Sequence, residues 1–391
     1  MPLVCFSREF CHKKMSMKIL IVSRYKAQYT AHVLPFVAEQ TASLSEAGCQ
    51  VELFLLRGNY LKQWKALRAK IREFKPDVIH AHYGLSCLLA NLATRRVPVV
   101  STYHGSDINM KSARRFSKIA MWLSAWNIFV SIRNMALAGA TEGKKCSLIP
   151  CGVELSEGQL MTREEARKAL GWSMDEKKVL FAGAFDNEVK DPELAHAVIA
   201  YLNSKSKKIE KNTELSDTCS IPNSIDHQSA NEQDSLQPNA QSCLIDSVAQ
   251  TLSDKSSQKM PKNSENGIVE LVELKGYTRE QVNTWMCAVD ALLMTSKTEG
   301  SPQVIKEAMA CGCPIVSVDV GDVKERLNGL EGCFVAPIVD RKLEIGKLAE
   351  ALKKAIAFEG KTNGREHILQ AGLSNEQVAE KIINIYRSLT K

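Results

Sequence analysis

The sequence predicts an α/β protein of two domains, each a parallel sheet with helices on both faces. Short apolar runs alternate with helical stretches over residues 17–150, and the same alternation returns over residues 151–391. Such alternation is typical of parallel sheets, whose strands are joined by helical crossovers. A length of 391 residues suffices for about two to three domains of ordinary size. Two such domains joined by a hinge leave a cleft, and open α/β sheets bind ligands outside the carboxyl ends of their strands.

The first domain is expected to cover residues 17–150, after an N-terminal extension over residues 1–16. The extension has basic residues but lacks the apolar core and small-residue cleavage site of a secretory signal. The expected strands are Lys18–Ser23, Val51–Leu55, Val78–His80, Val97–Thr102, Ile128–Val130 and Cys146–Ile149. The expected helices between them cover residues 34–47, 60–75, 85–95, 112–125 and 131–139.

The second domain is expected to begin after the turn at Pro150 and to cover residues 151–391. Its expected strands are Val179–Gly183, Val269–Leu274, Ala291–Met294 and Ile315–Val318, and its expected helices cover residues 192–203, 278–287, 302–311, 341–358 and 376–389. The last helix is a candidate to cross back to the first domain. Residues 203–267, rich in Ser, Asn, Gln, Asp and Lys, interrupt this domain and predict a disordered insertion, because they cannot bury enough apolar surface to offset ordering entropy.

Charge is divided unevenly between the two halves. Residues 1–150 hold 22 Lys and Arg against 8 Asp and Glu, a balance of +14, whereas the whole chain carries +7. A basic half favours an anionic partner. The chain has no nucleic-acid motif and no interleaved aromatics, so an anionic membrane surface or a phosphate-linked acceptor is expected rather than nucleic acid. Arg114, Arg115 and Lys118, beside the apolar stretch 119–130, are candidates to contact lipid headgroups, with a solvated face as the alternative.

The cysteines and hydropathy predict a cytoplasmic protein. An alternative within this prediction is a peripheral protein on the inner face of a membrane. Twelve cysteines are scattered without a CxxC pair or a Cys/His metal spacing, which indicates reduced thiols. No apolar run reaches the length of about 18 residues that spans a bilayer. His80 and His82 lack an obvious third ligand, so no metal is expected there.

Glu299 and Glu307 lie eight residues apart, between an apolar strand and a predicted helix whose first position suits Pro302. A helix N-terminus supplies unpaired N–H groups and a positive dipole end, so a diphosphate can rest on it. Glu307 projects from the same helix toward a neighbouring hydroxyl. A solvated loop glutamate beside a surface glutamate is the alternative interpretation.

This Glu-x7-Glu spacing resembles the motif of retaining, nucleotide-sugar-dependent glycosyltransferases of the GT-B fold, and the run up to Asp322 resembles glycosyltransferase family 4. The likeness covers residues 17–200 and 267–390. It implies two facing Rossmann-like domains, with Glu299 at the donor sugar and Glu307 on the ribose hydroxyls. The backbone between the two glutamates is then expected to hold the diphosphate, through Gly300, Ser301, Pro302 and Gln303.

Other strand ends resemble the same family. His104, before a glycine that lets backbone approach a ligand, resembles the histidine at the donor sugar; a structural hydrogen bond is the alternative. His82 and Tyr83 resemble the acceptor side. Lys190 resembles the lysine on the pyrophosphate, where it can neutralise the leaving group, although a loop lysine is more often solvated. Gly276 resembles the base-binding turn.

Two departures from the family occur in the donor pocket. Ala184 stands where the family commonly has an arginine on the pyrophosphate, and residues 23–26 contain no glycine where many members carry a glycine-rich loop. Lys190 is therefore the residue that matches a pyrophosphate-binding cation of the family.

The resemblance implies a retaining, hexosyltransferase-like enzyme that needs no metal or other cofactor. It would move a sugar from a nucleoside-diphosphate sugar to a sugar or lipid-linked acceptor in polysaccharide or glycolipid biosynthesis. A nucleotide-sugar 2-epimerase shares two such domains and would turn over the donor without an acceptor. A catalytically inactive nucleotide-sugar-binding regulator is favoured by Ala184 and by the missing glycine-rich loop. It is opposed by the presence of His104, Lys190, Glu299 and Glu307.

Overall fold

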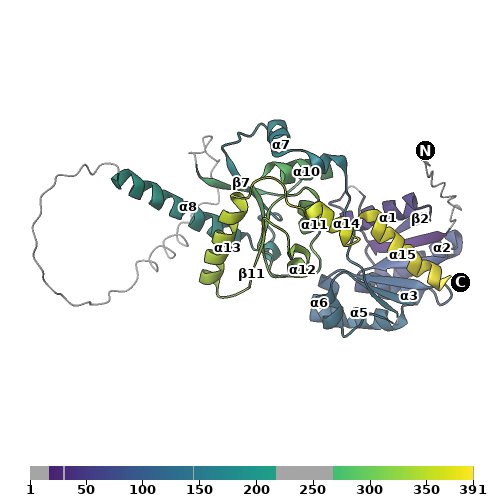
Figure 1. Cartoon of the computed structure of the whole chain (residues 1–391). Helices are drawn as coiled ribbons and strands as arrows, with labels where there is room; N and C mark the ends of the chain where they lie inside the picture. Colours follow the sequence, from purple (N-terminus) through teal and green to yellow (C-terminus); the bar gives the residue numbers. More distant parts are fainter. Residues whose placement is uncertain (1–16, 30, 144, 217–266, 391) are drawn as a thin grey trace, which may run out of the picture.

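The computed structural model describes residues 17–29, 31–143, 145–216 and 267–390 and contains two α/β domains (Figure 1). The first domain has a six-stranded sheet in the order β2-β1-β3-β4-β5-β6, with every neighbouring pair parallel. Its strands are β1 Lys18–Arg24, β2 Gln50–Leu56, β3 Val78–His82, β4 Val99–Tyr103, β5 Trp126–Phe129 and β6 Cys146–Leu148. Its helices are α1 Pro35–Glu46, α2 Tyr60–Phe74, α3 Gly84–Ala93, α4 Ser106–Asn109, α5 Lys111–Leu123 and α6 Ile132–Ala138.

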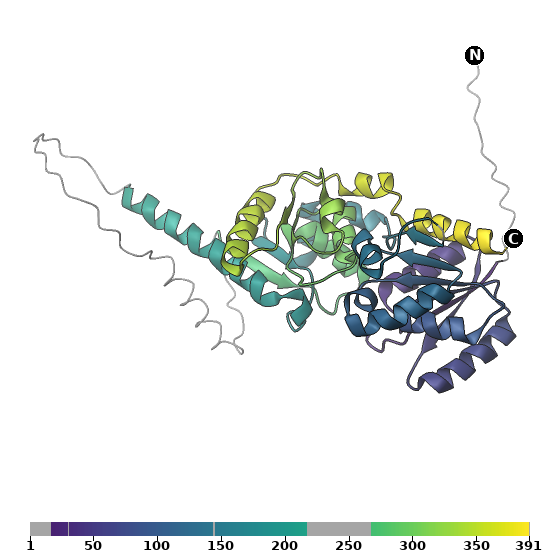
Figure 2. The ribbon, with the colours of Figure 1, turned by 90° about the horizontal axis from the view of Figure 1, so that it is seen from below.

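Helices cover both faces of this sheet because the strands are apolar on both sides. Successive residues of a strand point to opposite faces. Leu20 and Val22 of β1 accordingly pack with the layer formed by α2, α3 and α5. Ile19 and Ile21 face the other way, toward α1 and toward the last helix of the chain, α15 (Asn375–Leu389). Figure 2 shows α15 and α2 on opposite sides of the sheet.

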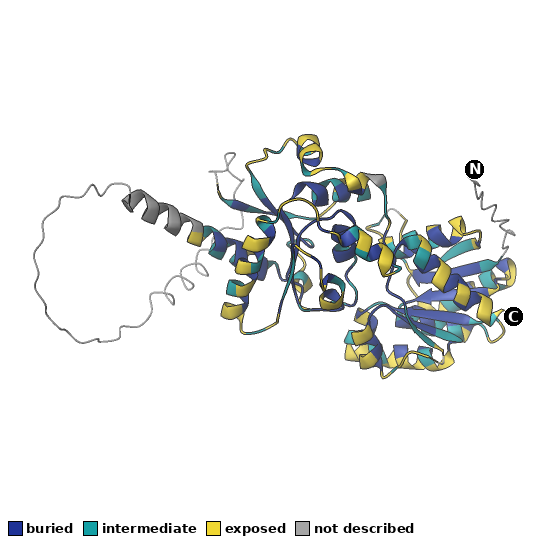
Figure 3. Ribbon diagram, viewed as in Figure 1, coloured by how far each residue is buried: buried dark blue, intermediate teal, exposed yellow. Residues whose placement is uncertain are grey.

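The second domain has a five-stranded sheet in the order β11-β10-β9-β7-β8, also parallel throughout. Its strands are β7 Lys177–Phe181, β8 Val269–Glu273, β9 Ala291–Met294, β10 Ile315–Val318 and β11 Cys333–Ala336. Its helices are η1 Glu157–Leu160, α7 Arg163–Leu170, η2 Glu188–Lys190, α8 Pro192–Ser216, α10 Arg279–Ala288, α11 Gln303–Ala310, α12 Val323–Leu327, α13 Arg341–Ile356 and α14 Gly364–Gln370. One continuous apolar core joins the strands to these helices, and Figure 3 shows both sheets buried beneath more exposed helices.

The last helix returns to the first domain. Val378, Ile382 and Tyr386 of α15 pack among the apolar residues of the first sheet, and the hydroxyl of Tyr386 lies 2.5 Å from Nδ1 of His80 in β3. The C-terminal helix therefore ties the second half of the chain to the first sheet.

The predicted fold class is confirmed, with corrections at particular boundaries. The helix expected to end at residue 203 continues as α8 to Ser216 and runs outward from the second domain (Figure 1), so residues 203–216 are not part of a disordered insertion. The rest of the expected insertion, residues 217–266, and the extension over residues 1–16 lie outside the described residues. Pro302 precedes α11 as its N-cap instead of occupying its first turn. The short elements β11, α7 and α14 were not predicted.

Within the described ranges, no helix combines the length and apolar character needed to cross a bilayer.

Candidate active site

The candidate site lies where the carboxyl ends of the two sheets meet. His82 ends β3, and His104 follows β4, while Glu299 to Gln303 follow β9 in the second domain. Contacts hold α11 against the segment that joins the domains: Nε2 of Gln303 donates to the carbonyl oxygen of Gly152 at 2.7 Å, and Nζ of Lys306 donates to that of Cys151 at 2.5 Å. The two predicted halves of the site are thus brought together.

The backbones of the two domains approach so closely that side chains are excluded. A Cβ atom on Gly300 would lie 2.2 Å from the carbonyl oxygen of His104, and one on Gly105 would lie 3.3 Å from the nitrogen of Gly300. Gly105 also has φ +144°, a conformation that favours glycine. Nearby, Nδ2 of Asn109 donates to Oγ1 of Thr298 at 3.2 Å. Glycine at these positions allows the cleft to close.

Lys190 and Glu299 form an ion pair, with 2.6 Å between Nζ and Oε1, and their side chains are 23% and 16% exposed. The lysine side chain crosses Gly183, where a Cβ atom would meet its Cγ at 2.8 Å. Oγ1 of Thr295 donates to the carbonyl oxygens of Lys190 and Asp191, both at 2.9 Å. The ammonium group is therefore held at the loop carboxylate.

The loop that carries Lys190 is also fixed from its other side. Asp191 has a positive φ of 53°, and its carboxylate receives two hydrogen bonds from the guanidinium of Arg341, at 2.6 and 2.9 Å. This contact lowers the pKa of Asp191, with burial opposing it. Such a pair stabilises a backbone conformation that is unfavourable for a residue with a side chain.

Glu307 lies on α11 and contacts Arg279, the first residue of α10, and the same guanidinium contacts Glu39 of α1. Burial raises the pKa of Glu39, against the opposing charge of Arg279. Burial disfavours the charged form of Arg279, but the two carboxylates outweigh it and raise its pKa. Arg279 thereby links Glu307 to the first domain, a connection that the sequence analysis did not predict.

Ser301 and Pro302 form the approach to the N-terminus of α11. The Ser301 hydroxyl donates to Oδ2 of Asp322 at 2.8 Å, and Nε of Arg326 donates to the same oxygen at 2.8 Å. Pro302 has no side-chain cap bond to the first turn, so the N–H groups that begin α11 remain suited to an anion.

Three histidines form a column beneath the cleft. The rings of His80 and His82 stack at 4.6 Å, those of His82 and His104 at 5.3 Å, and Nδ1 of His82 lies 3.0 Å from Nε2 of His104. Burial lowers the pKa of all three imidazoles, that of His82 to about 3. The column is therefore neutral at physiological pH.

The positions of His82 and His104 modify their expected roles. His82 is fully buried behind His104, so it supports that ring and does not line the acceptor side as expected. Both ring nitrogens of His104 have protein neighbours, since Nδ1 lies 3.6 Å from Sγ of Cys151. A sugar hydroxyl would thus have to displace one of these contacts or use the His104 carbonyl oxygen.

Tyr83 packs against His104, with 4.7 Å between the ring centroids. Its φ of +72° is unfavourable for a residue with a side chain. Burial raises the pKa of its hydroxyl. The strained backbone places the ring beside the histidine that was expected at the donor sugar.

Asp107 organises the loop after β4 and was not among the predicted site residues. Its buried carboxylate accepts hydrogen bonds from the backbone N–H groups of Gly105 at 2.9 Å, His104 at 3.1 Å and Gly84 at 3.1 Å. Burial raises its pKa, although these bonds oppose the rise. In the sequence, the one sign of this role is that Asp107 lies three residues after His104.

Gly276 lies on an exposed turn after β8, with φ +77°. The neighbouring Tyr277 packs on Trp285, with 4.6 Å between ring centroids, and the turn leads into Arg279. The turn expected at the nucleobase is therefore close in the chain to the residue that contacts Glu307.

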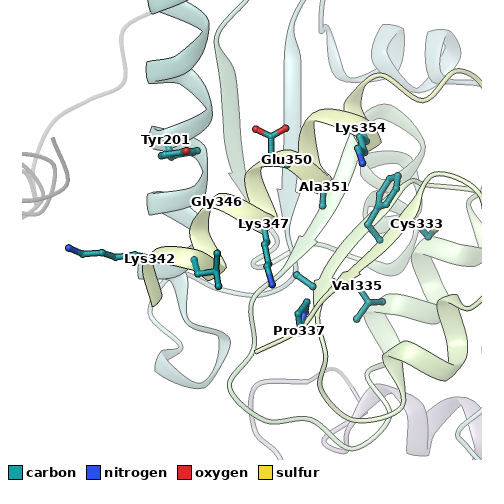
Figure 4. Close-up of a pocket in the computed structure, with 13 residues that line it drawn as sticks. Tyr201, Cys333, Val335, Pro337, Lys342, Gly346, Lys347, Glu350, Ala351 and Lys354 are labelled. Carbon is teal, nitrogen blue, oxygen red and sulfur yellow. The ribbon is translucent and has the colours of Figure 1, made fainter. Parts of the chain in front are cut away.

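In the described part of the chain, no group of three or more His, Cys, Asp or Glu residues could hold a metal ion. A groove of about 680 Å³ lies between α8, β11 and α13, away from the interdomain cleft, and its lining includes Tyr201, Lys347 and Lys354 (Figure 4). None of the predicted site residues lines it.

Two family models match the chain. The one described as Glycosyltransferase Family 4 matches residues 42–157, and the one described as Glycosyl transferases group 1 matches residues 250–357. The chain therefore contains glycosyltransferase family 4 and group 1 domains. The putative teichuronic acid biosynthesis glycosyltransferase TuaC of Bacillus subtilis (strain 168) is 26% identical over 300 residues, which cover 73% of this chain and 62% of TuaC. The match thus spans less than two thirds of that relative.

Solved structures share the fold of this chain. Sucrose-phosphate synthase from Thermosynechococcus elongatus has a TM-score of 0.66 and 19% identity, covering 95% of this chain and 99% of its own. Anabaena HepE in complex with UDP has a TM-score of 0.58 and 16% identity, and the match covers 95% of this chain and 100% of the HepE chain. The UDP-GlcNAc 2-epimerase from Methanocaldococcus jannaschii has a TM-score of 0.52 and 14% identity, and the match covers 95% of this chain and 100% of the epimerase chain. The fold therefore does not separate a transferase from an epimerase.

The histidine column predicts a loss of stability in acid. An unfolded histidine has a pKa of about 6.5, whereas buried His82 has one of about 3. Between these values the unfolded chain binds more protons, so stability falls as the pH falls below about 6.5. For His82 alone we expect a loss of about 2 kcal/mol at pH 5.

Urea unfolding at pH 7.5 and pH 5.0 measures this effect. The variant His82→Gln should lose less stability between the two pH values than the parent, while His367→Gln on α14 should behave like the parent. Equal losses in parent and His82→Gln would contradict the assignment.

Proposed function

We propose that the chain is a retaining glycosyltransferase that moves a sugar from a nucleoside-diphosphate sugar to a hydroxyl of a sugar or lipid-linked acceptor. The observation that carries the proposal is the pairing of Lys190 with Glu299 shortly before the start of α11, because a cation and a carboxylate near a helix N-terminus suit a diphosphate and its sugar. The name of TuaC supports polysaccharide synthesis, and the complex of HepE with UDP supports a uridine nucleotide donor.

In this proposal the bond between the anomeric carbon and the diphosphate oxygen breaks first, and the sugar gains oxocarbenium character. Lys190 and the N–H groups of α11 stabilise the charge on the departing diphosphate. The acceptor oxygen forms its bond on the face that the diphosphate leaves, and its proton passes to the departing phosphate. Glu299 is paired with Lys190 and orients the donor sugar, with His104 on the opposite wall.

Glu307 is proposed to bind the ribose hydroxyls, and Arg279 to orient it. The guanidinium approaches Oε1 of Glu307 from the turn that follows Gly276. Because Ala184 supplies no charge, Lys190 is proposed as the principal side-chain cation for the diphosphate.

Calorimetric titration with UDP-, GDP- and ADP-sugars tests the donor, followed by product analysis with and without acceptors. A product that keeps the anomeric configuration of the donor supports the proposal. Donor turnover without any acceptor would favour a 2-epimerase, and tight donor binding without turnover would favour an inactive regulator.

The variant Glu307→Ala should reduce donor use by about 10- to 150-fold, because it removes charge-assisted hydrogen bonds worth about 1.5–3 kcal/mol. Steady-state kinetics with varied donor measures the loss as kcat/KM. The variant Glu325→Ala, which removes an exposed glutamate on α12, is the matched control and should leave kcat/KM unchanged. Parent-like kinetics in Glu307→Ala would refute the ribose assignment.

A further inference from the structure

Helix α5 presents most of its large apolar side chains to solvent, while Met121 packs against the core. Its buried positions are small, Ser117 and Ala120, whereas Trp122 is 81% exposed, Ile119 50% and Phe116 47%. In a helix that only covers a sheet, large apolar residues face the core. The reversal in α5 indicates that its outer face has a partner.

The close approach of α3 explains why the inner face of α5 must be small. A Cβ atom on Gly84, the first residue of α3, would lie 1.9 Å from Oγ of Ser117, and that hydroxyl donates to the carbonyl oxygen of Asp107 at 2.8 Å. The inner face is therefore filled, and the exposed apolar residues cannot turn inward.

Basic residues surround the apolar side chains. Helix α5 carries Lys111, Arg114, Arg115 and Lys118 and no acidic residue. Arg114 is committed to the carbonyl oxygens of Ile108 and Asn109, at 2.5 and 3.1 Å, which corrects its expected place among the lipid contacts. Arg115 and Lys118 are exposed beside Phe116 and Ile119.

The neighbouring helices extend this composition. Helix α2 lies in the same layer and has five Lys and Arg residues against one acidic residue, Glu73. Leu61 of α2 and Leu92 of α3 are also exposed, and the two helices are tied by Nε1 of Trp64, which donates to the carbonyl oxygen of Leu92 at 3.0 Å. Figure 2 shows α5 and α2 on the side of the sheet away from α15.

We propose that the outer face of α5, formed by Arg115, Phe116, Lys118, Ile119, Trp122 and Leu123, docks the protein on an anionic phospholipid bilayer. A helix with a basic and an apolar side lies in the membrane interface, with its apolar residues among the acyl chains and its cations at the headgroups. Tryptophan is favoured at that depth. Nucleic acid would use the cations but not exposed Ile119 and Leu123. The docking surface is separate from the proposed chemistry and does not depend on it.

Sedimentation of the full chain with vesicles tests the surface, without donor or acceptor. Binding should rise with the fraction of phosphatidylglycerol in phosphatidylcholine and fall with salt, since exposed charges are screened over about 8 Å at physiological ionic strength. The double variant Arg115→Glu/Lys118→Glu should partition at least about tenfold less strongly. The double variant Lys353→Glu/Lys354→Glu, with the same charge change on α13, should bind like the parent.

Tryptophan fluorescence tests insertion of the apolar residues. The emission of the parent should shift to shorter wavelength on vesicles, and Trp122→Phe should lose most of that shift. Equal loss of binding in both double variants, binding that ignores lipid charge, or binding to duplex DNA without binding to vesicles would each overturn the proposal.

Discussion

Replacing Lys190 with alanine is expected to lower the turnover number for sugar transfer by about 100- to 1000-fold, the loss typical of removing one charge-stabilising donor from an active site. Negative charge collects on the diphosphate as its bond to the sugar breaks. The ammonium group is already in place, held 2.6 Å from Glu299 in a side chain that is only 23% exposed. A preorganised cation of this kind need not reorganise during the reaction, so its removal acts mainly on kcat.

Binding measurements separate this role from a structural one. Lys190→Ala should also weaken the affinity for a free nucleoside diphosphate, whereas His104→Ala and Glu299→Ala should slow transfer and leave that affinity nearly intact. Lys205, which pairs with Glu350 at 3.4 Å on the surface of the same domain, provides the control Lys205→Ala with parent-like turnover. Equal losses of diphosphate affinity in all three site variants would contradict the proposed division between sugar and phosphate.

The two parallel sheets could be predicted from the sequence because several strands are apolar on both faces. Runs such as Lys18–Ser23 and Ala291–Met294 have no polar face and must be covered twice, which requires a parallel sheet between helices. The motif residues could then be predicted because they follow the ends of strands, and those ends are recognised from local sequence alone. Elements missed in the second domain, such as β11 and α14, are short and carry weak patterns.

Contacts between distant elements could not be predicted in the same way. Arg279 joins Glu307 to Glu39, residues 28 and 240 positions away in the chain, and no local pattern signals such a bridge. The burial of His82 likewise depends on the neighbouring ring of His104. The sequence predicted lipid contacts for Arg115 and Lys118, but it did not show that Phe116 and Trp122 face solvent while Ser117 and Ala120 face α3.

The substitution Gly300→Ala is expected to lower kcat/KM for transfer by about 100-fold, the effect of a misplacement of about 1 Å in a catalytic site. The new Cβ atom would lie 2.2 Å from the carbonyl oxygen of His104 and 3.0 Å from Nδ2 of Asn134, both in the first domain. Because the clash is with backbone across the cleft, the domains must separate there. Glu299 and Lys190 would then move away from His104 together.

The expected change is in domain closure and not in the stability of either core. The melting temperature of Gly300→Ala should stay near that of the parent, and small-angle scattering should show a larger radius of gyration in the presence of donor. Gly346→Ala is the matched control: it lies within α13 with no heavy atom within 4 Å of the added carbon, so activity should be unchanged and stability equal or higher by about 0.5–1 kcal/mol. Full activity in Gly300→Ala would show that transfer does not require the close approach of Gly300 to His104, and a melting temperature lowered by many degrees would instead make Gly300 a packing residue of the folded chain.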